Sequence, residues 1–128
     1  MTGYAPASPA AYKQQSIMTA PPERLVVMLY DGAIRFFFQA AAALREGART
    51  TALERLQRGE AIVDHLLGTL DMERGGQIAQ NLEGIYVFCK RLLMEGRLES
   101  DPGKIETVRE LLGELRESWA QIAGVTSG

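Results

Sequence analysis

A long apolar stretch occupies residues 25–44 and has the sequence LVVMLYDGAIRFFFQAAAAL. If this stretch is helical, its apolar side chains form two rows along the helix, which we call seams, about 100° apart around the helix axis. The apolar face is therefore wider than one side of a helix bundle needs. A central place within its own bundle would cover this surface. The alternatives are an N-terminal arm, a second subunit or a hydrophobic groove that another polypeptide fills. The pattern alone leaves these explanations open.

The same stretch argues against a membrane span. It carries Asp31 and Arg35, and a charge at the membrane centre costs about 2.5–3.5 kcal/mol on insertion scales. The spacing of these two residues suits an ion pair on the surface of a helix instead. Residues 1–20 contain one charge, Lys13, and no apolar run of signal-peptide length before it. We therefore expect no secretory signal and no membrane insertion.

Three further helices are predicted after the first, each with one apolar seam. In the helix predicted over residues 77–95, Ile78, Leu82 and Cys89 share that seam. A capping box over residues 51–54, a turn over residues 73–76, and Asp101 followed by Pro102 indicate the helix starts. The four predicted helices span residues 21–47, 51–70, 77–95 and 101–123. Helices of this length with short connections predict an all-α fold, an antiparallel up-down four-helix bundle.

Length and composition fit one domain with short segments before and after it. The chain has 128 residues and a net charge of −2, which is unlike a nucleic-acid-binding protein. Pro6 and Pro9 break up the beginning of the chain. We therefore expect a flexible N-terminal arm over residues 1–20, a bundle domain over residues 21–124 and a disordered tail over residues 125–128.

Candidate catalytic and metal-binding residues are few. His65 is the only histidine, and the residue three positions before it is apolar, so the Glu-x-x-His pattern of a di-metal bundle is missing. Cys89 is the only cysteine and lies on an apolar seam, which favours a core position. Glu60 and Asp64 share a helix face and are interpreted as solvated. We expect no enzyme activity, no cofactor and no metal site.

Three segments carry a family resemblance. They are AYKQQSIMTAPPERLVVMLYDGA at residues 11–33, LDMERGGQIAQNL at residues 70–82 with Tyr86 following, and the looser LLGELRESW at residues 111–119. In this order and spacing they resemble the FliS family, the bacterial flagellar export chaperones of flagellin. The first two segments are long and specific, whereas the third would be weak alone. Residues 1–10 do not align well with the family.

The resemblance implies a cytoplasmic flagellar secretion chaperone with a four-helix bundle. Such a chaperone binds the disordered C-terminal segment of flagellin, prevents premature polymerisation and delivers flagellin to the type III flagellar export apparatus. It implies flagellin and the export gate as partners, and no nucleotide or catalysis. Wrapping a disordered apolar segment buries a large surface at moderate affinity, because ordering the segment offsets part of the gain.

The resemblance also suggests residues for partner binding. Three groups are expected: an arm that gates the site, apolar or aromatic contacts, and polar anchors. They are Tyr12, Ile17 and Met18 for the arm, Tyr30, Leu82 and Tyr86 for the contacts, and Asp71 and Asn81 for the anchors. Each could instead maintain the fold, since Asp71 and Asn81 are typical helix-capping residues. The aromatic run at residues 36–38 is bulkier than expected for the family, and it could alter the groove or promote self-association.

Other functions remain open at this point. One apolar groove can serve several disordered partners, so a regulatory module that sequesters another flagellar protein, such as an anti-sigma factor or an assembly regulator, is the main alternative. A homodimer that buries the first helix is another. A bundle enzyme or metal protein would require a bound cofactor, which no motif indicates.

Overall fold

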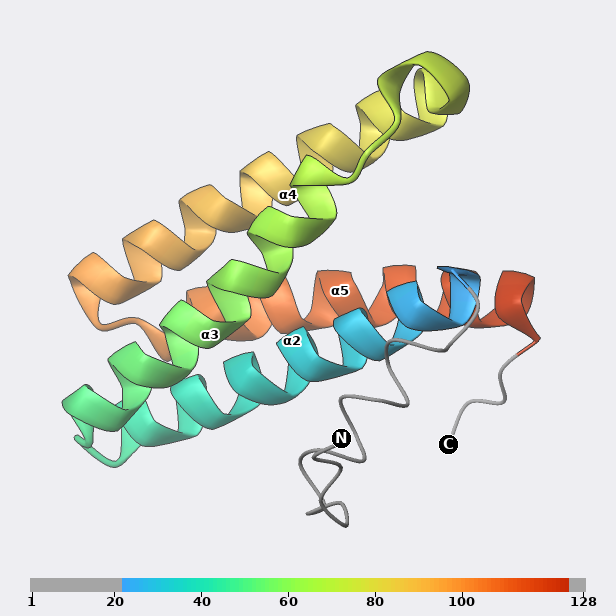
Figure 1. The fold of residues 1–128 in the computed structure, drawn as a ribbon. Helices are drawn as coiled ribbons and strands as arrows, with labels where there is room; N and C mark the ends of the chain where they lie inside the picture. Colours follow the sequence, from blue (N-terminus) through green and yellow to red (C-terminus); the bar gives the residue numbers. More distant parts are fainter. Residues whose placement is uncertain (1–21, 125–128) are drawn as a thin grey trace, which may run out of the picture.

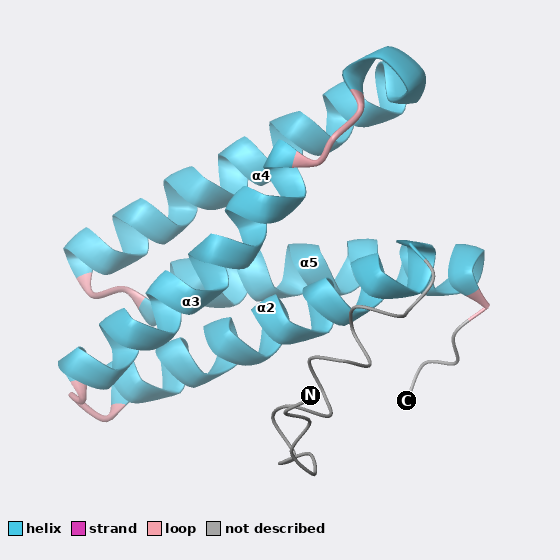
Figure 2. Cartoon of the chain, viewed as in Figure 1, coloured by secondary structure: helices cyan, strands magenta, loops and turns pink. Residues whose placement is uncertain are grey.

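The computed structural model describes residues 22–124 and shows an all-α four-helix bundle (Figure 1). The predicted arm residues Tyr12, Ile17 and Met18, and the predicted tail, lie outside the described residues. The helices are α2 (Pro22–Arg45), α3 (Arg49–Gly68), α4 (Met72–Glu99) and α5 (Pro102–Ala123). Short connections join them, and residues 22–124 contain no strand (Figure 2). Each helix packs against the next, and α2 packs against α5, which agrees with the predicted up-down order.

Helix α2 is the central helix of the bundle. It packs most extensively against α3 on one side and α5 on the other. Its buried side chains come from both predicted seams and include Tyr30, Ala33, Phe37 and Ala40. Among the helices of residues 22–124, α2 is the one long and apolar enough to cross a membrane by composition. Packing inside the bundle therefore fully buries part of that wide apolar face, while side chains such as Val26 and Leu29 stay half-buried.

The helix boundaries test the capping predictions. Asp101 caps α5 as predicted, and its side chain accepts a hydrogen bond from the backbone N–H of Gly103 at 2.9 Å. The predicted capping box over residues 51–54 is wrong. Helix α3 begins at Arg49, and its N-cap, Ala48, makes no side-chain cap. The backbone N–H of Ala52 donates a hydrogen bond to the carbonyl of Ala48 at 3.0 Å, so the first turn of α3 already forms ahead of the predicted start.

The predicted turn over residues 73–76 is instead the first turn of α4. Asp71 caps this turn, and Gly76 interrupts the helix with φ 51° and ψ −129°. A side chain at Gly76 would strain this left-handed backbone, which glycine adopts freely. The helix then continues to Glu99, past the predicted end at residue 95. Residues 72–75 therefore form a kinked cap on a long helix.

The aromatic run at residues 36–38 divides between core and surface. Phe37 is fully buried and packs where α3 has Gly59. A Cβ atom at Gly59 would lie 2.4 Å from Cε1 of Phe37, so only glycine leaves room for this ring. Phe38 is 56% exposed, and the guanidinium of Arg109 lies 5.6 Å from its ring centroid. Only one ring of the run fills the centre of the bundle.

Ion pairs between helices correct two predictions about surface charge. Asp31 does not pair with Arg35; it accepts a hydrogen bond from Nε of Arg116 on α5 at 2.8 Å. The neighbouring helix supplies a better-placed cation than the residue one turn away.

Glu60 and Asp64 likewise do not form a purely solvated face. Glu60 pairs with Arg97 at 2.9 Å, and Asp64 pairs with Lys90. Both pairs join α3 to α4. The prediction failed because the two carboxylates lie beside basic residues of α4. The sequence pattern of α3 alone does not show which side chains of another helix lie opposite.

Candidate functional site

The two ends of the bundle differ. We call the end with the connections at residues 46–48 and 100–101 the closed end, and the end with the connection at residues 69–71 the open end. At the closed end, Leu56, Leu93 and Ile105 are fully buried. At the open end, the first part of α4 and the end of α3 diverge from α2 and α5 (Figure 1).

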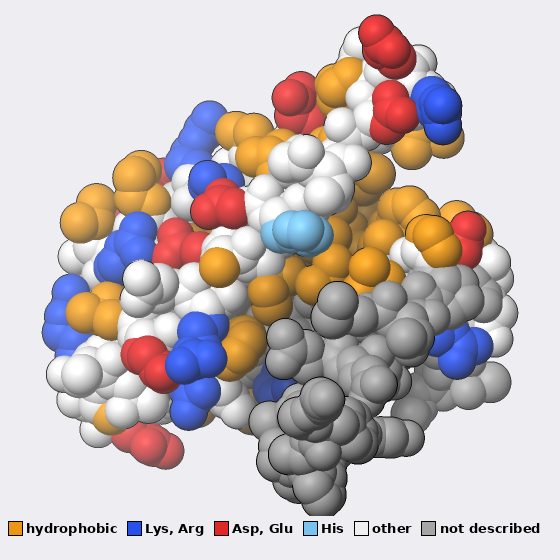
Figure 3. All heavy atoms as spheres, in the orientation of Figure 1, with side chains coloured by type: hydrophobic (Ala, Val, Ile, Leu, Met, Phe, Trp, Pro, Cys, Tyr) orange, Lys and Arg blue, Asp and Glu red, His pale blue; other side chains and the backbone are white. Residues whose placement is uncertain are grey.

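A cavity of about 400 Å³ lies at this divergence, and we call it the open-end groove. All four helices contribute to it. Its apolar lining includes Val26, Leu66, Leu70, Ile78, Leu82 and Trp119. Hydrophobic side chains gather in the hollow between α4 and the α2–α5 pair (Figure 3). A volume of this size lies within the range of ordinary ligand pockets.

Apolar side chains are also exposed around the open end. Ile78 is 71% exposed and Met72 is 40% exposed, both in the first two turns of α4. Ile122, near the end of α5, is 68% exposed. A groove surrounded by exposed apolar side chains is typical of a surface that binds another polypeptide.

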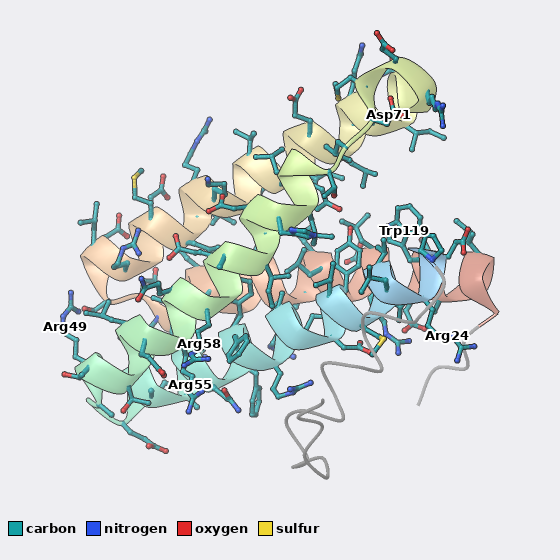
Figure 4. All side chains as sticks on the ribbon, viewed as in Figure 1. Arg24, Arg49, Arg55, Arg58, Asp71 and Trp119 are labelled. Carbon is teal, nitrogen blue, oxygen red and sulfur yellow. The ribbon has the colours of Figure 1, made fainter. Side chains whose placement is uncertain are left out.

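Polar residues occupy one rim of the groove. Asp71, the N-cap of α4, and Trp119 on α5 lie across the opening from each other (Figure 4). The Asp71 carboxylate accepts a hydrogen bond from the backbone N–H of Arg74 at 3.0 Å. Its other oxygen lies 3.7 Å from Nε of Arg74, and both side chains are mostly exposed. The rim therefore offers a carboxylate and a guanidinium beside an apolar lining.

Two tyrosines meet at the base of the groove. Their hydroxyls share a hydrogen bond, and their ring centroids are 6.5 Å apart. Tyr30 is fully buried and Tyr86, which lines the groove, is 2% exposed. Burial raises the pKa of both hydroxyls, and for Tyr30 hydrogen bonding to Tyr86 and Trp119 opposes this rise. The pair links α2 and α4, which lie diagonally across the bundle.

The structure brings four of the predicted site residues together. Tyr86, Leu82 and Asp71 line the open-end groove, and Tyr30 bonds to Tyr86 at its base. Asp71 also caps α4, so the capping role is present alongside its place on the rim. Partner contact by these residues stays a prediction.

Asn81 lies elsewhere. Its side chain accepts a hydrogen bond from Nε2 of Gln77 at 2.9 Å. It lines a second, more open hollow of about 600 Å³ between α4 and α5, together with Phe88 and Leu111. Successive residues of a helix point in different directions, so Asn81 and Leu82 face different hollows.

Sequence reasoning missed Ile78 as a groove residue. The seam pattern placed it in the core with Leu82 and Cys89, yet it is 71% exposed. The seam is continuous, but the helices facing it diverge at this end. A seam residue in the first turns of a helix that lies away from its neighbours has no partner to cover it. Val26 and Trp119, also on predicted seams, line the groove for the same reason.

The remaining candidate catalytic or metal-binding side chains of the described residues do not gather at one site. Cys89 is fully buried, and burial raises the pKa of its thiol to about 11. It is therefore protonated at neutral pH and packs as a small hydrophobic residue. His65 is exposed on α3. Within residues 22–124, no group of three or more histidine, cysteine or acidic side chains is placed to hold a metal ion.

Comparison with known proteins gives consistent matches. The family model described as "Flagellar protein FliS" matches residues 4–126. The flagellar secretion chaperone FliS of Salmonella typhimurium strain LT2 is 36% identical over 111 residues, covering 86% of this chain and 82% of the relative. That of Vibrio cholerae serotype O1 is 34% identical over 116 residues, covering 88% and 85%. That of Bacillus subtilis strain 168 is 29% identical over 111 residues, covering 87% and 82%.

Proposed function

The chain belongs to the FliS family of flagellar proteins, and we propose that it binds the disordered C-terminal segment of flagellin in the cytoplasm. Binding would prevent premature polymerisation and deliver flagellin to the type III flagellar export apparatus. The observation that carries the proposal is the open-end groove, an apolar hollow formed by all four helices. The relatives' name, flagellar secretion chaperone, supports the same role.

The groove suits a segment that is disordered when free. A disordered segment loses conformational entropy on binding, so it needs a large apolar surface to bind at useful affinity. The groove supplies such a surface, and exposed Ile78 and Met72 extend it along α4. Covering the apolar side chains of flagellin in this way would keep them from associating with other flagellin molecules.

The proposed role requires binding and release, without bond making or breaking. Each helix supplies part of the groove, so its shape depends on the folded bundle rather than on one reactive side chain. We propose that the chain acts without enzymatic activity and that flagellin leaves by competition at the export gate. A partner held by apolar burial can be exchanged in this way, because no covalent link has to be broken.

The test is calorimetric titration of the full chain with the C-terminal segment of flagellin from the same organism. Ile78→Gln and Leu98→Gln form a matched pair, since both side chains are on α4 and are 71% and 74% exposed. Ile78 lines the open-end groove, whereas Leu98 lies near the closed end. Removing about one buried apolar side chain should weaken binding about tenfold for Ile78→Gln. Leu98→Gln should bind like the wild-type chain.

Two results would contradict the proposal. The first is the absence of binding heat at tens of micromolar with both components intact. The second is a partner captured from cell extract that is a flagellar regulator, with no flagellin present. That result would favour the regulatory module over the export chaperone.

A further inference from the structure

The outer face of α4 carries apolar side chains that the bundle does not cover. Most of the large hydrophobic side chains exposed within residues 22–124 lie on α4, and some of them do not line the open-end groove. These are Val87, Phe88, Met94 and Leu98. The inward side of the same helix already contributes to the core. The exposed side chains therefore form a second apolar face on α4.

Arg91 lies in the middle of this second face. Neighbouring positions on a helix surface are three or four residues apart. Val87 and Phe88 lie one turn before Arg91, and Met94 lies one turn after it. Leu98 lies one turn beyond Met94. We call these five residues the outer α4 patch. The Arg91 side chain is exposed and forms no ion pair with any other residue of the described range 22–124.

The composition of the outer α4 patch is typical of a protein interface. Phenylalanine, methionine and arginine are enriched at interfaces, and a guanidinium that is unpaired in the free protein can bind a carboxylate of a partner. Phe88 also lines the hollow of about 600 Å³ between α4 and α5. Gly84 lines the same hollow, and the space around its Cβ position is open. A partner would find exposed apolar side chains with a depression beside them.

A second copy of the chain fits this patch poorly. In a two-fold symmetric dimer the same surface meets itself. Arg91 lies at the centre of the patch, so the two Arg91 side chains would approach each other across such an interface. Like charges brought together at an interface are unfavourable. A different partner, with an acidic side chain at the corresponding place, would pair with Arg91 instead.

We infer that the outer α4 patch binds an amphipathic α-helix of another protein, which carries an acidic residue within its apolar face opposite Arg91. Positions 87, 91, 94 and 98 follow the alternating steps of four and three residues by which two helices pack along a seam. They extend about 17 Å along α4, which matches about three turns of a partner helix. The patch lies apart from the open-end groove, so the inference does not depend on flagellin binding there.

The test uses two designed helical peptides as probes. Both have leucine at heptad spacing along one face, and the middle of that face holds glutamate in one peptide and lysine in the other. In calorimetric titrations, the full wild-type chain should bind the glutamate peptide about tenfold more tightly than the lysine peptide. Arg91→Glu should reverse this preference. Loss of folding or unspecific apolar association would not reverse it, because the reversal follows a single charge.

Two further variants locate the binding site. Met94→Gln removes an apolar contact of the patch and should weaken binding of the glutamate peptide about tenfold. Ile78→Gln changes the open-end groove and should leave that binding within about twofold of wild type. Both side chains are exposed on α4, so both variants should fold like the wild-type chain.

Four results would overturn the inference. The first is that neither peptide binds the wild-type chain, and the second is an unchanged peptide preference in Arg91→Glu. The third is a dimer in sedimentation that Met94→Gln abolishes, which would assign the patch to a second copy. The fourth is weaker binding of the flagellin segment by Met94→Gln, which would assign the patch to flagellin. Failure of flagellin to bind the wild-type chain would contradict the proposed function alone.

Discussion

The closed end and the open end of the bundle are formed by the same four helices, yet they bury their seams to different extents. On the predicted seam of α4, Cys89, which is nearer the closed end, is fully buried, whereas Ile78 at the open end is 71% exposed. Both residues satisfy the same helical periodicity. The difference shows that a seam predicts which face a helix turns inward, while its neighbours decide whether that face is covered.

The comparison also separates stability from binding. The closed end combines a fully buried core with cross-links between helices, such as the hydrogen bond from Arg49 to Ser100 at 2.7 Å. The open end has a groove and a kinked first turn of α4. Binding surfaces are commonly drawn from the less stable parts of a fold. Substitutions at the two ends should therefore have different consequences.

The largest expected effect comes from two leucines on α4. Leu93→Ala removes a fully buried side chain and should lower the free energy of unfolding by about 2–5 kcal/mol. Leu82→Ala, in the half-buried lining of the groove, should lower it by about 1 kcal/mol and weaken flagellin-segment binding more clearly. Urea unfolding followed by circular dichroism, with calorimetry for binding, checks both. Similar stability losses for the two variants would contradict the distinction between the ends.

A smaller effect is expected from the kink in α4. Gly76→Ala places a side chain at φ 51°, which should lower the free energy of unfolding by about 1–3 kcal/mol. Gly84→Ala is the control, because it lies in regular helix with open space around its Cβ position. That change should stabilise the chain by about 0.5–1 kcal/mol. Urea midpoints compare the two variants, and a gain in both would show that the kink is not required.

The smallest expected effect concerns pH and the closed end. A hydrogen bond from Arg109, together with Arg45 on α2, lowers the pKa of Glu106. A lowered pKa in the folded state means that this stabilisation is present above the ordinary value of 4.5 and is lost as the pH falls through the folded value. Glu106→Gln should therefore lower the free energy of unfolding by about 0.2–1 kcal/mol at neutral pH.

At acid pH the difference between wild type and Glu106→Gln should vanish. Urea midpoints measured at neutral pH and at successively lower pH should converge for the two chains as the Glu106 carboxyl becomes protonated, since glutamine is uncharged throughout. Glu114→Gln is the control, because Glu114 is exposed on α5 and joins no ion pair among residues 22–124. A difference that persists at acid pH would assign the effect to packing instead of charge.

Much of the fold and part of the site could be predicted. The helices followed from apolar periodicity, and Asp101 with Pro102 marked the start of α5, because caps act through neighbouring residues. The capping box at residues 51–54 failed because α3 already begins at Arg49, with Ala48 as its N-cap. Asp71, Leu82 and Tyr86 were named from family motifs and lie together at the groove. Asn81 was named with them and faces another hollow.

The sequence by itself determined the helices, the apolar seams and the family, since each depends on residues close together in the chain or on their order. Only the tertiary structure decided that Asp31 pairs with Arg116 and that Tyr30 bonds to Tyr86. It also decided that the helices diverge at one end and leave Ile78 uncovered. These features depend on the distances between helices, which are set when all four helices pack their apolar faces into one core. A seam pattern specifies the direction of each side chain but not the distance to its neighbour.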